Sequence, residues 1–185
     1  MKIKSLLLTA FFVSCSVGHA QSALLKISSS DIAPNSTITS KHVFNGFGCT
    51  GENAFPQISW SNPPLGTKGY ALTVYDPDAP TGSGWWHYAA INIPSTYNSL
   101  PASIAAENKF SVKDGIKQIR NDFGNYSFGG PCPPVGDKAH RYIFTIYALK
   151  TDKLDVPETA TTALAGYMIN QNSIAKASFT GFYKR

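Results

Sequence analysis

A carboxylate and two imidazoles stand at the ends of apolar runs in this chain. The apolar run 70–75 leads directly into Asp76-Pro77-Asp78-Ala79-Pro80, and the next apolar run begins at His87. A second histidine, His140, follows a loop rich in glycine and proline and precedes the longest apolar run, 141–149. Imidazole rings and the free backbone N–H groups of such loops can donate hydrogen bonds to a phosphate or carboxylate. These residues therefore predict a site for a small anion.

The loops that carry these side chains are expected to be rigid. Proline fixes φ and removes a backbone donor, so Asp76 is held in a stiff turn. If the apolar runs on either side of this turn pair as a hairpin, Asp76 and His87 lie at the same end of the sheet. His140 joins them only if the loop 129–139 reaches that end as well, and spacing alone does not decide this. Taken singly, an Asp-Pro turn or a histidine at the start of a strand is more often structural.

The same side chains allow a second interpretation, a metal-dependent hydrolase. Two histidines and one carboxylate, here Asp76, His87 and His140, can bind a metal ion and leave open positions for a hydrolytic water. The sequence contains no Gly-x-Ser-x-Gly elbow, and Ser83 has no evident base beside it. We therefore favour a binding module without turnover, metal or cofactor. In such a module, protonation of both histidines is expected to strengthen anion binding below pH ~6.5.

Short apolar runs separated by Pro, Gly and Asn turns predict a mostly β protein. Runs that are apolar on both faces belong to strands covered from two sides. One helix is expected over 159–171, after Pro157, and it should pack across a sheet through residues at helical spacing, namely Ala160, Ala163, Leu164, Tyr167 and Met168. The expected fold is an antiparallel β-sandwich with one or two short helices. The expected strands are 23–27, 58–60, 70–75, 87–93, 141–149 and 177–183.

The N-terminus has the pattern of a cleaved signal peptide over residues 1–20, which leaves a single domain at 21–185. Two lysines precede a short apolar stretch and the small-residue site Gly18-His19-Ala20. A lipoprotein signal that retains Cys15 is the less favoured alternative. Loss of Lys2 and Lys4 lowers the sixteen basic residues to fourteen against eleven acidic ones, a formal charge of +3. This dispersed charge lacks the dense basic stripe of nucleic-acid-binding proteins, and the predicted location is the periplasm or the exterior.

Two cysteines, Cys49 and Cys132, remain in the expected mature chain, both in glycine-rich loops. An exported protein meets an oxidising compartment, so we favour a disulfide between them over two buried free thiols. A bridge that closes a loop of about 80 residues would stabilise the fold by roughly 4 kcal/mol if it is unstrained.

Several segments carry a family resemblance that extends from about residue 25 to the C-terminus. In these segments the sequence resembles the phosphatidylethanolamine-binding protein family, also called Raf kinase inhibitor-like proteins, and within it the bacterial YbhB/YbcL branch. The segments are Gly48-Cys49-Thr50-Gly51-Glu52-Asn53 with Pro56, Tyr75-Asp76-Pro77-Asp78-Ala79-Pro80, Gly82-Ser83-Gly84-Trp85-Trp86-His87, Arg120-Asn121-Asp122-Phe123-Gly124, Gly130-Pro131-Cys132-Pro133-Pro134 and His140-Arg141-Tyr142.

The resemblance implies a β-sandwich with a small anion pocket at one end, and an ion pair between Arg141 and Asp78. Family members bind phosphate-bearing head groups and similar anions, and often act by inhibiting kinases or proteases. Relatives of the bacterial branch suggest a homodimer. The residues that the resemblance places at the pocket are Asp76, His87, His140, Pro80, Trp85, Tyr142 and Pro131.

Two departures from the family pattern limit what the resemblance implies. Eukaryotic members have histidine where this chain has Trp86. Eukaryotic members also have a C-terminal helix that helps gate the site, and this chain has no evident counterpart of that helix after Tyr183. Both departures disfavour phospholipid as the ligand, and export disfavours a cytosolic kinase partner. A secreted protease inhibitor or effector that acts through another surface therefore stays open as a further alternative.

Overall fold

The computed structural model describes residues 24–185 of the protein. The expected signal peptide at 1–20, Cys15 and the first residue of the expected strand 23–27 lie outside the described residues. The first strand of the structure, β1, is Lys26–Ser28.

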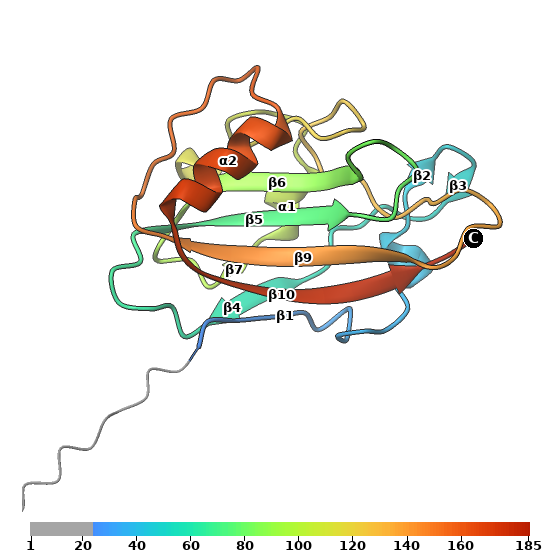
Figure 1. Ribbon diagram of the computed structural model, residues 1–185, viewed down its shortest axis with the longest axis horizontal. Helices are drawn as coiled ribbons and strands as arrows, with labels where there is room; N and C mark the ends of the chain where they lie inside the picture. Colours follow the sequence, from blue (N-terminus) through green and yellow to red (C-terminus); the bar gives the residue numbers. More distant parts are fainter. Residues whose placement is uncertain (1–23) are drawn as a thin grey trace, which may run out of the picture.

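A five-stranded antiparallel sheet forms the centre of the molecule (Figure 1), with strand order β10-β9-β5-β6-β8. Every expected strand of this sheet is present, and each extends somewhat beyond its predicted bounds. β10 gains most, because Ser173 to Lys176 continue its pairing with β9. The strands are β5 Gly69–Asp76, β6 Trp85–Pro94, β8 Lys117–Gln118, β9 His140–Leu149 and β10 Ser173–Tyr183.

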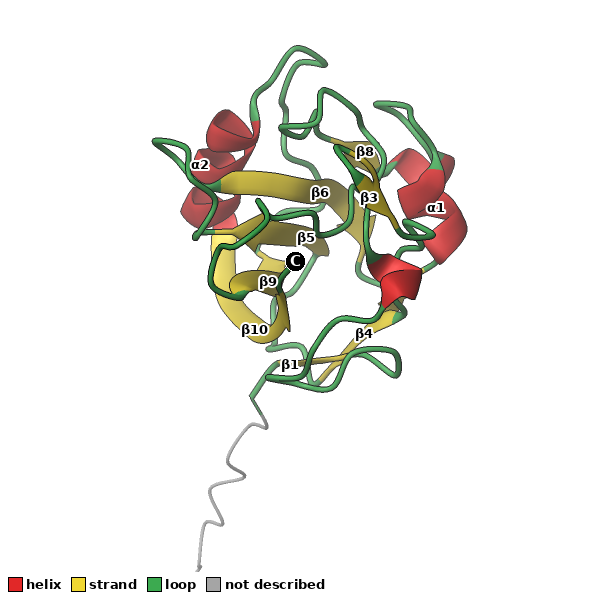
Figure 2. Ribbon diagram, turned by 90° about the vertical axis from the view of Figure 1, so that its right-hand side faces the viewer, coloured by secondary structure: helices red, strands yellow, loops and turns green. Residues whose placement is uncertain are grey.

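A second, three-stranded sheet of order β1-β4-β7 faces the first across the main core (Figure 2). Its other strands are β4, Ile58–Ser61, and β7, Ser99–Leu100. A small ribbon of β2, Asn45–Gly46, and β3, Cys49–Thr50, lies at the end of the sandwich where β5 terminates (Figure 1). This arrangement confirms the predicted β-sandwich.

The central strands β5 and β9 are apolar on both faces because both faces are covered, as predicted. Their inward side chains, such as Leu72 and Phe144, belong to the main core. Their outward side chains, such as Ala71 and Leu149, pack in a second core with residues of the helix α2 and of the segment before it. Figure 1 shows α2 lying across this outer face of the sheet.

The helix α2 covers Thr162–Asn172, slightly later than predicted. It begins after Thr161, whose hydroxyl accepts a hydrogen bond from the Leu164 N–H at 3.2 Å and so caps the first turn. The predicted packing residues are correct in part: Ala160 and Met168 pack in the second core, whereas Leu164 and Tyr167 are exposed. Ala165 and Ile169 are the buried apolar residues of the helix instead.

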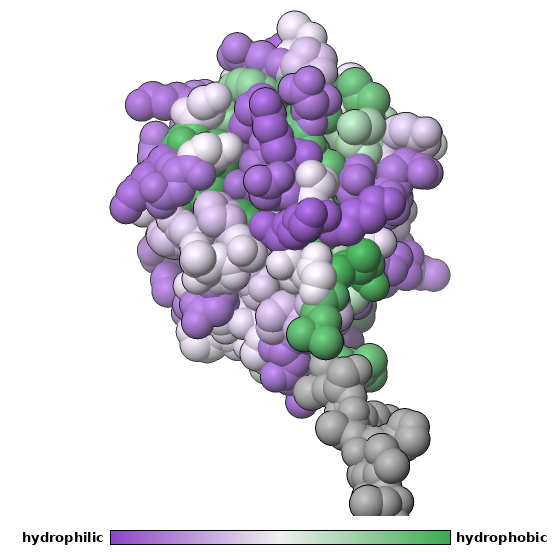
Figure 3. All heavy atoms as spheres, turned by 90° about the vertical axis from the view of Figure 1, so that its left-hand side faces the viewer, coloured by the Kyte–Doolittle hydropathy of each residue, from purple (hydrophilic) through white to green (hydrophobic). Residues whose placement is uncertain are grey.

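The other helices are short: α1 is Ala102–Ala106, and single 3₁₀ turns cover Ser40–His42 and Lys113–Gly115. Within residues 24–185 no helix combines the length and the apolar character needed to cross a bilayer. Figure 3 views the end opposite to β2 and β3, where hydrophilic residues cover most of the surface and hydrophobic ones form small groups.

The main core should dominate stability. Leu72→Ala removes a fully buried side chain from β5 and is expected to lower the free energy of unfolding by about 2–5 kcal/mol. Leu65→Ala is the matched control, because Leu65 is fully exposed and its loss should change stability by less than about 0.5 kcal/mol. Urea titration of both variants measures the difference, and equal effects would contradict this description of the core.

Candidate functional site

The hairpin of β5 and β6 brings the first predicted site residues together. Asp76, the last residue of β5, is paired with Trp85, the first residue of β6. The turn that joins them is tight: Gly84 has a φ of 69°, and a Cβ there would lie 2.6 Å from the Asp76 carbonyl oxygen. A larger residue at this position would therefore force the turn to open. The structure confirms the predicted hairpin and its shared end for Asp76 and His87.

A β-bulge interrupts the alternation of side chains in β6 beside the site. The register between β5 and β6 shifts next to Tyr75, and this shift leaves His87 as an additional residue in β6. An additional residue of this kind re-aims the side chains beside it. Alternation along the strand places Trp85 and His87 on the side of one cavity, whereas Trp86 packs against Tyr75 with ring centroids 4.4 Å apart. The bulge lets the next residue, Tyr88, face inward as well, where it pairs with Val74 and belongs to the main core. The sequence gave no sign of this bulge.

The loop before β9 delivers His140 to the same end of the sheet. His140 Nδ1 lies 2.8 Å from Asp76 Oδ2, and His140 Nε2 lies 3.3 Å from Asp137 Oδ2. The second carboxylate oxygen of Asp76, Oδ1, accepts the backbone N–H of Asp78 at 2.8 Å. Both nitrogens of His140 therefore face carboxylates, and Asp76 is held from two sides. The convergence that spacing left open is present.

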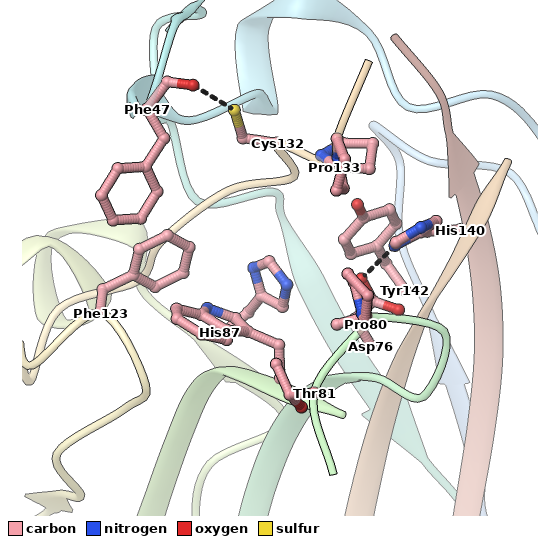
Figure 4. A pocket seen from close by; sticks show the side chains of 13 residues that line it. Phe47, Asp76, Pro80, Thr81, His87, Phe123, Cys132, Pro133, His140 and Tyr142 are labelled. Carbon is pink, nitrogen blue, oxygen red and sulfur yellow. Dashed lines mark hydrogen bonds and ion pairs between the residues drawn. The ribbon is translucent and has the colours of Figure 1, made fainter. Parts of the chain in front are cut away.

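These loops enclose a cavity of about 200 Å³ (Figure 4). Six predicted pocket residues line it, and Pro131 does not. Pro131 instead uses its carbonyl oxygen to accept the Phe44 N–H at 3.0 Å, which anchors the loop behind the wall. The lining residues are Asp76, Pro80, Trp85, His87, His140 and Tyr142 as predicted, together with Phe47, Ala79, Thr81, Phe123, Cys132, Pro133 and Pro134.

His87 is held by a backbone carbonyl group and by two aromatic rings. Its side chain is buried, and its Nδ1 lies 2.7 Å from the Gly129 carbonyl oxygen. The ring packs edge-on against Phe123 and Tyr142, with centroids 5.4 and 5.1 Å away. Burial lowers the pKa of His87 from its ordinary 6.5 to about 4, despite the hydrogen bond to Gly129. The expectation that His87 becomes protonated just below pH 6.5 was therefore wrong.

Phe123 forms a wall of the cavity that sequence reasoning did not assign. Its ring lies against Gly129, where a Cβ would come within 2.5 Å of it. Asn121 fixes the turn that carries Phe123: its Nδ2 donates to the His87 carbonyl oxygen at 3.1 Å, and its Oδ1 accepts the Phe123 N–H at 3.1 Å. The only sequence signal was the Arg120-to-Gly124 motif, which carries the family resemblance without revealing this contact.

The adjoining wall is held by the disulfide between Cys49 and Cys132, whose residues are 83 apart in the sequence. The bridge was predicted and is present. It joins the loop that carries Phe47 to the loop of Cys132 and Pro133 (Figure 4). Arg185 connects the same two loops, because its guanidinium donates to the carbonyl oxygens of Pro133 at 3.0 Å and Phe47 at 3.3 Å.

The ion pair between Arg141 and Asp78 lies beside the pocket and is also present as predicted. The Arg141 guanidinium donates to both carboxylate oxygens of Asp78, at 2.6 and 2.8 Å, and the Arg141 backbone N–H donates to Asp78 at 2.9 Å. These bonds lower the pKa of Asp78 to about 2. Asp78 therefore stays ionised and ties the Asp-Pro turn to β9.

Three lining side chains have a buried polar atom without a hydrogen-bond partner in the described chain. These atoms are the indole Nε1 of Trp85, the Nε2 of His87 and the hydroxyl oxygen of Tyr142. Buried polar groups are normally satisfied, since an unmade hydrogen bond costs about 1–3 kcal/mol. Three such atoms around one cavity make it suited to a small polar molecule.

The alternative of a metal site finds no matching geometry in residues 24–185. No group of three His, Cys, Asp or Glu side chains there is arranged to hold a metal ion. Asp76 and His140 are hydrogen bonded to each other, and His87 Nδ1 is taken by Gly129. Joint coordination by the three would require the contact between Asp76 and His140 to break.

Fold and site together define an antiparallel β-sandwich domain with a pocket at the end of its main sheet. The family model for phosphatidylethanolamine-binding proteins matches residues 28–184, and the chain belongs to that family.

The comparisons also support the bacterial branch. The UPF0098 protein YbcL of Escherichia coli is 49% identical over 89% of this chain and 90% of its own length. The UPF0098 protein YbhB of the same organism is 41% identical over 86% of this chain and 99% of its own length. The crystal structure of Escherichia coli YbcL matches with a TM-score of 0.83 and 48% identity, covering 88% of this chain and 99% of that one.

The low pKa of His87 should make stability depend on pH. Between pH 6.5 and 4 the unfolded chain binds a proton at His87 that the folded protein does not, so stability is highest above pH 6.5 and falls on acidification. The loss due to this group should reach about 2 kcal/mol at pH 5. Urea titrations at pH 7 and 5 should show a smaller loss for His87→Gln than for the unmodified protein. Equal losses would contradict a buried neutral His87.

The disulfide should contribute strongly to stability because it closes a long loop. Replacement of Cys49 and Cys132 together by serine is expected to lower the free energy of unfolding by about 2–4 kcal/mol. Thermal or urea unfolding measures this, and addition of reductant to the unmodified protein should have a similar effect. A double variant as stable as the bridged protein, with the unmodified protein insensitive to reductant, would disprove the role.

Proposed function

We propose that this protein is an exported binding module that holds a small anionic, phosphate-bearing ligand in the pocket of Asp76, His87 and His140. The observation that supports it most is the set of three unpartnered buried polar atoms on side chains that line the pocket. The family name, which refers to a phosphate-bearing head group, points to the same ligand chemistry.

The pocket favours binding over turnover. A catalytic nucleophile needs a base within hydrogen-bond reach. Neither the Tyr142 hydroxyl nor the free Nε2 of His87 has a partner in the described chain, so the two are not paired. The Thr81 hydroxyl donates to the Gly84 carbonyl oxygen, and Cys132 is in the disulfide. The walls are prolines and aromatic rings held by a disulfide. We infer that the pocket is a rigid receptor. A protein partner or a second copy of the chain would then recognise the ligand or the ligand-bound protein.

Export is the part of the proposal that rests on the N-terminal pattern and on the disulfide. Disulfides persist in oxidising compartments such as the periplasm, and the bridge between Cys49 and Cys132 fits such a location. Cleavage after Ala20 and retention through Cys15 both place the folded domain there. Mass spectrometry of the protein purified from its host would distinguish the two, because only the second leaves an acylated Cys15 at the N-terminus.

Tyr142 provides a sharp test of ligand binding. Tyr142→Phe removes one hydroxyl at the pocket and should weaken binding of phosphorylethanolamine about 10-fold or more, since a hydrogen bond to a charged group contributes about 1.5–3 kcal/mol. Tyr88→Phe is the matched control, because the Tyr88 hydroxyl is also buried and unpartnered but does not line the pocket. NMR titration measures both affinities.

In the same titration, the resonances of Trp85 Nε1–H and of the His87 ring should shift as the ligand is added. Absence of any shift from these groups, or equal weakening by Tyr142→Phe and Tyr88→Phe, would rule out this pocket as the binding site.

A further inference from the structure

The hydrogen bond between His87 and Gly129 fixes the role of the imidazole in the pocket. A carbonyl oxygen only accepts, so the proton of the neutral ring is on Nδ1, which lies 2.7 Å from the Gly129 oxygen. Nε2 then carries a lone pair. This atom is buried, and no group in residues 24–185 donates to it. His87 therefore presents an acceptor, rather than a donor, to a ligand.

The groups around His87 keep it in this neutral form. Asp76 favours a charged ring and His140 disfavours it, but burial outweighs both and lowers the pKa of His87 to about 4. The third titratable neighbour, Tyr142, has its pKa raised by burial and stays a protonated hydroxyl. Between pH 6 and 8, His87 Nε2 can therefore accept a hydrogen bond and cannot give one.

The remaining polar groups of the cavity provide few donors for an anion. Trp85 and Tyr142 offer one N–H and one O–H. Asp76 is an acceptor, and both nitrogens of His140 face carboxylates, those of Asp76 and Asp137. In the described part of the chain, no lysine or arginine lines the cavity. A fully ionised oxyanion, which has acceptors only, would meet the lone pair of His87 and leave it unsatisfied.

A singly protonated phosphate monoester matches this arrangement. Its P–O–H group can donate to the lone pair of His87, and its ionised oxygens can accept from Trp85 and Tyr142. Its single negative charge also suits a cavity without a lysine or arginine better than a double charge would. Sulfate esters and phosphodiesters have no O–H group on the oxyanion near neutral pH and cannot make the first contact.

We propose that the pocket selects phosphate monoesters in their singly protonated form, with the acidic O–H of the ligand donating to His87 Nε2. This inference rests on the proposed function and narrows it, because it excludes sulfate esters and phosphodiesters. Intact phospholipids are phosphodiesters and are excluded with them, in line with the departures from the family pattern that disfavour phospholipid as the ligand. It also reverses the direction of the hydrogen bond that the sequence suggested for His87.

An isosteric ligand pair tests the proposal on the unmodified, disulfide-bonded protein. Phosphorylethanolamine and ethanolamine O-sulfate have the same ammonium group and differ in the protonatable oxygen. Calorimetric titration at pH 6 should show the phosphate ester binding at least about 100-fold more tightly, as expected when a buried polar group would otherwise stay unpaired. Glycerophosphoethanolamine, a diester with the same ammonium group, should bind as weakly as the sulfate.

The pH profile identifies the source of the proton. The affinity for phosphorylethanolamine should fall about tenfold per pH unit above the second phosphate pKa near 6, and buffers of different ionisation enthalpy should reveal proton uptake on binding. The affinity for ethanolamine O-sulfate should not vary with pH over this range. A sulfate that gains affinity on acidification would show that the protein takes up the proton, and this would overturn the proposal.

The possible failures are distinguishable. If the phosphate and sulfate esters bind within threefold of each other, the protonated-ligand proposal is wrong while the anion-binding function stands. If neither binds, both proposals fail. His87→Gln adds a second readout, because an amide can donate as well as accept: the preference for phosphate over sulfate should drop at least 10-fold, and an unchanged preference would also overturn the role of His87.

Discussion

The hydrogen bond from His87 Nδ1 to the carbonyl oxygen of Gly129 sets the polarity of the pocket, and with the Gly129 N–H bond to the His87 carbonyl oxygen it connects β6 to the glycine-proline loop. It holds the ring in place, and Phe123 can stack against the same backbone because residue 129 has no side chain. It also determines the tautomer, and with it the kind of atom that a ligand meets. Three further contacts fix the segments around this bond. They are the disulfide, the ion pair of Asp78 with Arg141 and the turn at Asn121.

The sandwich and the shared end of Asp76 and His87 could be predicted because their signals are local, whereas the approach of His140 was left open by spacing and implied only by the family resemblance. Proline-rich turns directly follow or precede long apolar runs, and a hairpin places the residues of its turn at one end of a sheet. The disulfide could be predicted for a similar reason, since two cysteines in an oxidising compartment allow one pairing. The pairing of Arg141 with Asp78 came from the family resemblance and agrees with the geometry.

The parts that could not be predicted depend on contacts between distant segments. Phe47 and Phe123 line the pocket only because Asn121 and the disulfide position their loops. The buried face of α2 was predicted only in part, because the helix packs through Ala165 and Ile169 while Leu164 is exposed. The protonation state of His87 likewise follows from tertiary burial, which no local sequence pattern records.

The bulge in β6 affects how this fold and its pocket can change during evolution. Tyr75 pairs with Trp86 and Val74 pairs with Tyr88, so deletion of His87 alone would restore regular pairing with β5. The strand would keep its other pairs, the core beneath it and Trp85 opposite Asp76, yet the imidazole would be lost from the cavity. Deletion of a single codon could therefore remove the ligand-binding side chain without removing the fold, and a relative could keep the architecture after losing the ligand.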